Sequence, residues 1–425
     1  MIGSLAVALL SLLALSLPVG VVLFLLGFGV DQFFSPFPLI RGLGQMVWSS
    51  SNSSLLIAIP FFVLLGEILV RAGIAERTFK ALDTWLSWLP GGLIHANIGT
   101  ATVFSATSGS SVATAATVAT VAMPQADKLG YNPRLFSGAI AAGGTLGIMI
   151  PPSINLIVYG FLTETSIPRL FLAGLIPGLL LALSFIIVTA IICQIKPALG
   201  GPRRRFSWHQ RLQSLRDLIP IAVLFLVVIG SIYRGWATPT EAAALGVAMA
   251  LFIAALNRGL GLAILRDALL GTVKITAMIM FIIIGAYFLN YTLASAGLGR
   301  ELQAFLSGLD LGPYGTLLVL VALYIVLGFF IETLSLMVAT IPIVVPIVAA
   351  LGFDKVWFGI LLILLIEMAL ITPPVGLNLF VVQGARQRGH LTEVMVGAIP
   401  YVLTMFVMAI VLIVFPQLAL WLPNL

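Results

Sequence analysis

Charged side chains are scarce in this sequence. Only 8% of the 425 residues are Asp, Glu, Lys or Arg, whereas 60% are hydrophobic. A soluble domain carries about 25% charged residues, so the composition excludes an ordinary soluble enzyme or binding module. Apolar windows long enough to span the hydrocarbon core recur from end to end, and they predict an all-α polytopic membrane protein with about 10–12 membrane-embedded segments.

Several chemical groups that enzymes use are also rare or missing. The one cysteine, Cys193, cannot form an internal disulfide. The three histidines (His95, His209 and His390) are scattered, and the sequence contains neither an H-E-x-x-H zinc motif nor a G-x-x-x-x-G-K-[ST] phosphate loop. We therefore expect no bound cofactor, no transition metal and no direct use of ATP. An intramembrane serine hydrolase is a weaker alternative, because the stretch Ser105–Ser111 has no base near it in the sequence.

Two proline pairs interrupt apolar sequence that is otherwise long enough to cross a bilayer. They are Pro151-Pro152 and Pro373-Pro374, and an asparagine follows each pair, at Asn155 and Asn378. Proline removes a backbone donor and blocks a helical turn, so each helix must break there. Such a break persists in lipid only where protein or a cavity covers the freed backbone groups. Paired broken helices are therefore the best pointer in the sequence to a transport site.

The same order of elements occurs twice along the chain, because Pro151 corresponds to Pro373 and Gly73 to Gly297 at nearly the same offset. An odd number of predicted crossings separates the two copies, which makes the repeats inverted. We divide the chain into an N-terminal span with an outer loop (1–53), a first repeat (54–195), a basic cytoplasmic loop with central scaffold helices (196–271) and a second repeat (272–425). The first repeat contains a re-entrant hairpin (92–124) and a broken helix (135–165), and the second contains a hairpin (312–352) and a broken helix (356–384).

Basic residues predict the orientation. If the polar segment Lys196–Asp217 is cytoplasmic, most of the 21 lysines and arginines fall on the cytoplasmic side, and so does the N-terminus. The net charge of +6 is then explained by basic loops that face anionic membrane lipid, and no nucleic-acid partner is expected.

Small polar residues gather at the predicted hairpin tips and helix breaks. Hydroxyl, amide and main-chain oxygens are the ligands that a hard cation such as Na⁺ prefers, and half-helix N-termini favour a substrate carboxylate. The candidate Na⁺ ligands are Ser105, Thr107, Ser108, Ser110, Ser111, Pro151, Ser153 and Asn155 for one site, and Glu332, Thr333, Ser335, Thr372, Pro373 and Asn378 for a second. The candidate substrate-binding residues are Gly109, Ser110, Pro152, Asn155, Thr333, Pro374 and Asn378. The alternative is that small residues, such as Gly143 and Gly147, only permit close helix packing.

Four acidic residues lie at or near membrane depth. Glu67 precedes Arg71 by one helical turn and is expected to pair with it, and Glu241 fits the first turn of a helix. Glu332 and Glu367 lie at the second tip and shortly before the second break, so they are better candidates for the transport path. Proton coupling through them remains open at this stage.

Four ordered motifs carry a resemblance that covers nearly the whole chain. Ser105–Ser111, Gly144–Ser153, Thr238–Ala244 and Thr372–Asn378 resemble the DctM-type large membrane subunit of tripartite ATP-independent periplasmic (TRAP) transporters. The resemblance implies an importer of the bacterial inner membrane that takes up an organic acid with Na⁺. It also implies an elevator mechanism, in which a transport domain slides against a scaffold.

The resemblance further implies two partners, a small four-helix membrane subunit (DctQ type) and a periplasmic substrate-binding protein (DctP type) that delivers the substrate. The small subunit should be a separate protein, because the chain begins directly at the large-subunit pattern. One alternative is a self-sufficient Na⁺/carboxylate symporter without a binding protein. A non-transporting assembly subunit is a further alternative, although it would not need paired broken helices.

Overall fold

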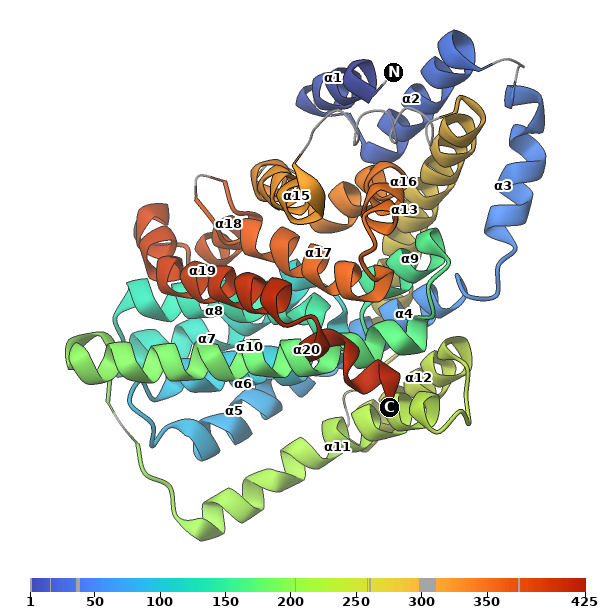
Figure 1. Cartoon of the computed structure of the whole chain (residues 1–425). Helices are drawn as coiled ribbons and strands as arrows, with labels where there is room; N and C mark the ends of the chain where they lie inside the picture. The colour runs from blue at the N-terminus through green and yellow to red at the C-terminus, as the bar shows by residue number, and fades with distance from the viewer. Residues whose placement is uncertain are drawn as a thin grey trace.

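The computed structural model describes residues 2–15, 17–35, 39–202, 204–257, 259, 261–297, 311–329, 331–373 and 375–425. Within these ranges the regular structure is helical (Figure 1). The helices of the N-terminal part are α1 (Ile2–Ala14), α2 (Val19–Phe34), α3 (Leu43–Ser51), α4 (Ala58–Arg71), α5 (Ile74–Leu86), α6 (Leu93–Ser108), α7 (Ser111–Leu129), α8 (Pro133–Met149), α9 (Ile154–Thr163) and α10 (Ile167–Ile195). The C-terminal part contains α11 (Trp208–Tyr233), α12 (Pro239–Leu256), α13 (Leu262–Ser295), α15 (Gly312–Gly328), α16 (Thr333–Ala350), α17 (Lys355–Ala369), α18 (Leu377–Arg386), α19 (Leu391–Val414) and α20 (Gln417–Leu420).

The described helices are long and apolar enough for a protein that crosses the membrane many times. Six of them meet the length and hydropathy needed for a span, and two bent pairs raise the number to eight. One bent pair is α4 with α5, at 68°, and the other is α8 with α9, at 41°. The helices α2, α6 and α15 add shorter apolar segments. The predicted all-α, multi-span fold class is confirmed.

The helices pack in two groups (Figure 1). In the first, which we call the peripheral group, α2 packs along α13, and α4 packs against α12 and α13. In the second, which we call the central group, α8 packs against α6, α7 and α19, and α17 packs against α15 and α16. The helix α5 bridges the groups, since it contacts both α6 and α11. Direct contacts between the groups include those of α4 with α6 and of α13 with α16.

Buried side-chain hydrogen bonds tie the central group together. The Tyr159 hydroxyl of α9 donates to the Lys355 carbonyl at 2.7 Å, and the Trp357 indole of α17 donates to the Leu412 carbonyl of α19 at 2.8 Å. Both aromatic side chains are almost completely buried. Such bonds satisfy polar groups that lipid and apolar side chains cannot, so they favour one fixed arrangement of these helices.

Two helices begin earlier than the sequence predicts. Ser207 and Gln210 form a capping box, which satisfies the first backbone donors of α11 and starts the helix within the segment expected to be a loop. The helix α13 begins at Leu262, so the division drawn between residues 271 and 272 lies inside a helix. The division into four domains otherwise stays a prediction.

The N-terminal span predicted within residues 1–53 consists of two helices, α1 and α2, and Pro18 directly precedes the first residue of α2.

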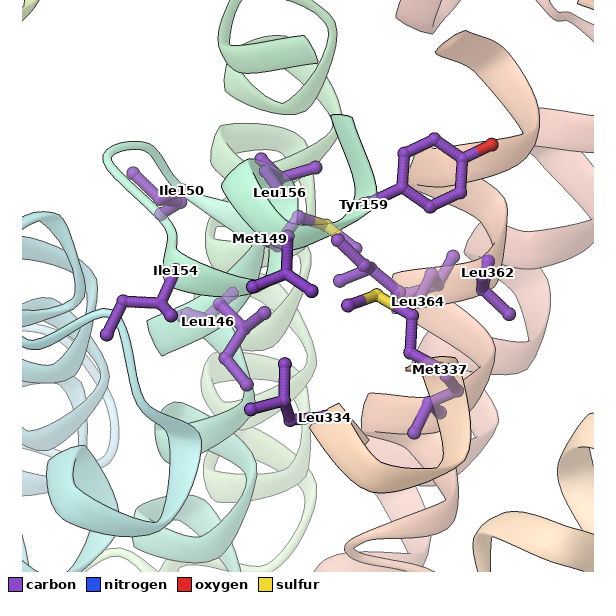
Figure 2. Packing of buried hydrophobic residues seen from close by; sticks show 14 of the residues in the cluster. Leu146, Met149, Ile150, Ile154, Leu156, Tyr159, Leu334, Met337, Leu362 and Leu364 are labelled. Atoms are coloured by element: carbon purple, nitrogen blue, oxygen red, sulfur yellow. The ribbon is translucent and has the colours of Figure 1, made fainter. Parts of the chain in front are cut away.

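Both predicted helix breaks occur where the prolines lie. The helix α8 ends at Met149 and α9 begins at Ile154, with the Ser153 side chain accepting a hydrogen bond from the Leu156 amide at 3.4 Å. The second break separates α17 from α18. Figure 2 shows the apolar side chains around the first break, including Leu146 and Met149 of α8 and Leu334 of α16. Helices of the two repeats therefore cover the exposed backbone, as a break inside a membrane requires.

Candidate functional site

The first hairpin turns at Gly109. Its φ of +57° is in the left-handed region, and a Cβ there would lie 3.1 Å from the Ile154 side chain, so both backbone and space favour glycine. Ser110 then caps α7 by accepting a hydrogen bond from the Ala113 amide at 3.4 Å. The candidate ligands Ser105, Thr107 and Ser108 belong to the end of α6, and their side chains lie outside the described residues.

The tip of the first hairpin packs closely on α8 of the first broken helix. A Cβ on Gly147 would lie 2.8 Å from the Thr114 hydroxyl and 3.0 Å from the Ser110 carbonyl oxygen. A Cβ on Gly144 would lie 3.0 Å from the Ser111 carbonyl oxygen. Small residues therefore do permit close packing here, and this packing brings the tip beside the break.

The first break presents buried polar groups to this tip. Pro151, Pro152 and Ser153 are buried, and Asn155 is 4% exposed. The Asn155 side-chain nitrogen makes no hydrogen bond to any described residue. A buried donor without a partner is costly, so this amide is available to a ligand.

The second hairpin turns just before α16. Glu332 caps this helix by accepting a hydrogen bond from the Ser335 amide at 3.1 Å, and its own side chain is exposed. Thr333 is 1% exposed and donates to the Glu367 carboxylate of α17 at 3.3 Å.

The second break reaches across to the first hairpin. The Asn378 side-chain amide donates to the Ser111 hydroxyl at 2.9 Å and to the Ala141 carbonyl at 3.3 Å. The sequence grouped Asn378 with the second tip, whereas the structure places it against the first. Thr372 donates to its own helix at Met368 (2.6 Å), Thr372 and Pro373 are half-buried, and Pro374 lies outside the described residues.

A cavity of about 80 Å³ lies where these elements meet. Its polar lining comes from both hairpin tips and the first break, through Gly109, Ser110, Ser111, Asn155, Glu332 and Thr333. Ile275, Met278 and Ile279 of α13 line it as well, so a helix of the peripheral group forms part of its wall. The cavity offers oxygen ligands and an amide but no Lys or Arg side chain among its described lining residues.

Comparisons with known proteins agree with this architecture. Residues 6–418 match the family model described as the DctM component of the tripartite ATP-independent periplasmic transporter. The C4-dicarboxylate TRAP transporter large permease protein DctM of Pseudomonas aeruginosa is 35% identical over 92% of this chain and 91% of its own. The chain belongs to the DctM family of TRAP transporters.

Two further similarities extend the comparison. The sialic acid TRAP transporter large permease protein SiaM of Vibrio cholerae is 33% identical over 90% of this chain and 88% of its own. The solved structure of the YdaH transporter of Alcanivorax borkumensis shares the fold with a TM-score of 0.63, at 16% identity, and the match covers 95% of this chain and 98% of that one.

Membership of the DctM family tests several predictions made from the sequence. The chain is a membrane subunit of a bacterial transporter and not an enzyme, and the family implies the inner membrane as its location. A tripartite transporter implies a small membrane subunit and a periplasmic binding protein beside this subunit.

Sequence reasoning missed three features of this DctM site. One is the bond between Asn378 and Ser111, which joins the repeats and has no signal in either repeat alone. Another is the contribution of Ile275, Met278 and Ile279, because an apolar residue on a membrane helix can face lipid or protein equally well. The contact between Thr333 and Glu367 was not predicted either, although Glu367 stood out as an acid inside an apolar run.

Proposed function

We propose that this DctM subunit imports an organic acid anion together with Na⁺, using the cavity between the hairpin tips and the first break as its transport site. The observation that carries the proposal is the convergence of both tips on one cavity with oxygen and amide groups on its walls. Oxygen ligands suit Na⁺, and the helix N-termini at Ser111 and Thr333 suit an anionic group.

The coupling ion has an electrostatic purpose. An anion that enters a cell with an inside-negative potential works against about 2.3 kcal/mol per charge per 100 mV. Co-transport of a larger number of Na⁺ ions reverses the sign of the transported charge, so the same potential then drives uptake. Ser110, Ser111, Ser153 and Asn155 are the proposed Na⁺ ligands near the first tip, and Thr333 and Ser335 near the second.

The proposed mechanism is an elevator in which the central group carries the site past the peripheral group. The internal bonds of the central group, such as that between Tyr159 and Lys355, support its movement as one unit. The wall that faces it across the cavity is apolar, with Ile275, Met278 and Ile279, and such a surface can slide without breaking hydrogen bonds. We also propose a cytoplasmic N-terminus.

The proposed partners are a DctQ-type membrane subunit of about four helices and a DctP-type binding protein in the periplasm. The relatives are named for C4-dicarboxylates and sialic acid, which supports an organic acid as the class of substrate here. Selectivity within that class would lie largely with the binding protein, because no described basic side chain lines the cavity.

Reconstitution in liposomes tests the proposal. The complex of both membrane subunits, loaded with its binding protein and labelled organic acid, should accumulate substrate when an inward Na⁺ gradient is imposed, and K⁺ at the same concentration should not replace Na⁺. Uptake without any need for Na⁺ would contradict the proposal. Uptake that needed Na⁺ but no binding protein would favour a self-sufficient symporter instead.

A further inference from the structure

Glu367 is a fully buried carboxyl group in the middle of the central group. Glu367 is 0% exposed, and every residue of α17 from Val356 to Ala369 is buried. One carboxylate oxygen accepts the hydrogen bond from Thr333, and the other makes no hydrogen bond to any described residue. Half of this carboxylate is therefore left without a partner.

Charge makes this arrangement costly. Among the described residues no lysine, arginine or histidine forms an ion pair with Glu367, and the ion pairs that are described lie elsewhere, for example between Arg204 and Asp83. On translocon-insertion scales, an acidic side chain at the centre of a membrane helix raises the free energy of insertion by roughly 2.5–3.5 kcal/mol. A buried carboxylate of this kind must either take up a proton or pair with a positive group, and the described side chains do not supply that group.

The oxygen atoms around Glu367 are arranged for such a partner. The Thr333 hydroxyl of the second tip donates to the carboxylate, and Ser111 of the first tip lines the same cavity as Thr333. Asn378, which touches the same Ser111, uses its amide nitrogen on Ser111 and Ala141. Its side-chain oxygen is buried and makes no hydrogen bond to a described residue. The cluster therefore contains two buried acceptors, a carboxylate oxygen of Glu367 and the amide oxygen of Asn378, that receive no hydrogen bond from a described residue.

We propose that Glu367 is the charged ligand of a Na⁺ site that it forms with Ser111, Thr333 and Asn378. The site would join the two hairpins, because Ser111 belongs to the first and Thr333 to the second. This inference rests on the proposed Na⁺ coupling and adds a ligand and a geometry to it. All four side chains offer oxygen, which is the ligand class of a hard cation.

This site would make movement of the central group depend on ion binding. Without the cation, the central group would carry an uncompensated carboxylate past Ile275 and Met278 of α13, against the low dielectric of an apolar wall. With the cation bound, the net charge of the cluster is zero, and the ion holds both tips at once. Ion binding is therefore coupled to closure of both hairpins and to movement.

Thermal unfolding of the purified complex of this chain with its small subunit tests the site without relying on transport. NaCl is titrated while choline chloride keeps the ionic strength constant, and the rise of Tm gives the Na⁺ midpoint. Glu367→Gln keeps the shape of the side chain and removes its charge, so we expect the Na⁺ midpoint to rise by about tenfold or more. Glu67→Gln is the control, since Glu67 pairs with Arg71 on α4 of the peripheral group, and its midpoint should match the wild type.

The outcomes separate this inference from the proposed function. A wild-type midpoint in Glu367→Gln, with Na⁺-driven uptake intact, overturns the site and leaves the proposed function standing. The same holds if the variant keeps its Na⁺ response and loses only a dependence on pH, because the carboxyl would then hold a proton. A wild type that shows no Na⁺ effect on Tm or uptake overturns the proposed function first. If Glu367→Gln does not fold, Glu367→Asp replaces it, with a weakened but Na⁺-specific response expected.

Discussion

Asn378 and Ser111 hold the two repeats together through a hydrogen bond of 2.9 Å. Ser111 is the first residue of α7 in the first hairpin, and Asn378 lies in the first turn of α18 after the second break. Helix packing also crosses between the repeats: α18 of the second repeat lies against α7 of the first, and α16 of the second lies against α9 of the first. Each hairpin is thus supported by the broken helix of the other repeat, and the candidate site is shared between them.

The crossed bond should contribute measurably to stability. Asn378→Ala removes the amide and leaves the buried Ser111 hydroxyl and Ala141 carbonyl without this donor, which should cost about 1–3 kcal/mol. Thermal unfolding should therefore show a lower Tm. The matched control is Asn52→Ala at the exposed end of α3, and an equal, small change in both variants would contradict the crossed arrangement.

The tip of the first hairpin should tolerate no added methyl group at Gly147. An alanine Cβ there would lie 2.8 Å from the Thr114 hydroxyl and 3.0 Å from the Ser110 carbonyl, so the tip must shift away from the break. We expect Gly147→Ala to lose most Na⁺-driven uptake while the protein still inserts into the membrane. Gly29→Ala in α2, where nothing lies within 4 Å of the new Cβ, should transport normally.

The contact between α8 and α19 should depend on glycine in the same way. A Cβ on Gly397 would overlap the Arg134 carbonyl, which is backbone and cannot rotate aside. Overpacking of a tight contact typically costs about 1–3 kcal/mol, so Gly397→Ala should lower Tm and the yield of folded protein. Gly384→Ala in α18 has open space around its Cβ and serves as the control. Equal stability of the two variants would show that the helices are not this close.

An ion pair should anchor the basic linker between α10 and α11 to α5. Arg204 donates to both oxygens of Asp83, at 2.7 and 2.6 Å, and Asp83 is mostly buried, with 13% of its side chain exposed. Asp83→Asn should lower stability by about 1.5–3 kcal/mol, the range of a hydrogen bond to a charged group. Glu76→Gln breaks a pair with Lys80 whose side chains are 64% and 57% exposed, and it should change Tm little. Urea or thermal unfolding of both variants makes the comparison, and a larger effect of Glu76→Gln would contradict it.

The helix breaks were predictable because proline acts locally. The proline pairs at Pro151 and Pro373 interrupt their helices whatever the tertiary contacts around them. The small residues near Gly147 indicated close packing. The start of α11 at Trp208 was missed, because the capping box at Ser207 lies in a segment whose charge indicated a loop. The pairing of Asn378 with Ser111 depends on how the two repeats cross, and no residue within one repeat encodes that relationship.

Movement of the central group past α13 is the central claim, and a crosslink tests it most directly. Met278 of α13 and Leu334 of α16 line the same cavity from opposite groups. Met278→Cys with Leu334→Cys, in a Cys193→Ala background, should crosslink with a short bismaleimide and lose Na⁺-driven uptake, while each single cysteine variant transports normally after the same treatment. Full uptake by the crosslinked protein would contradict the elevator account.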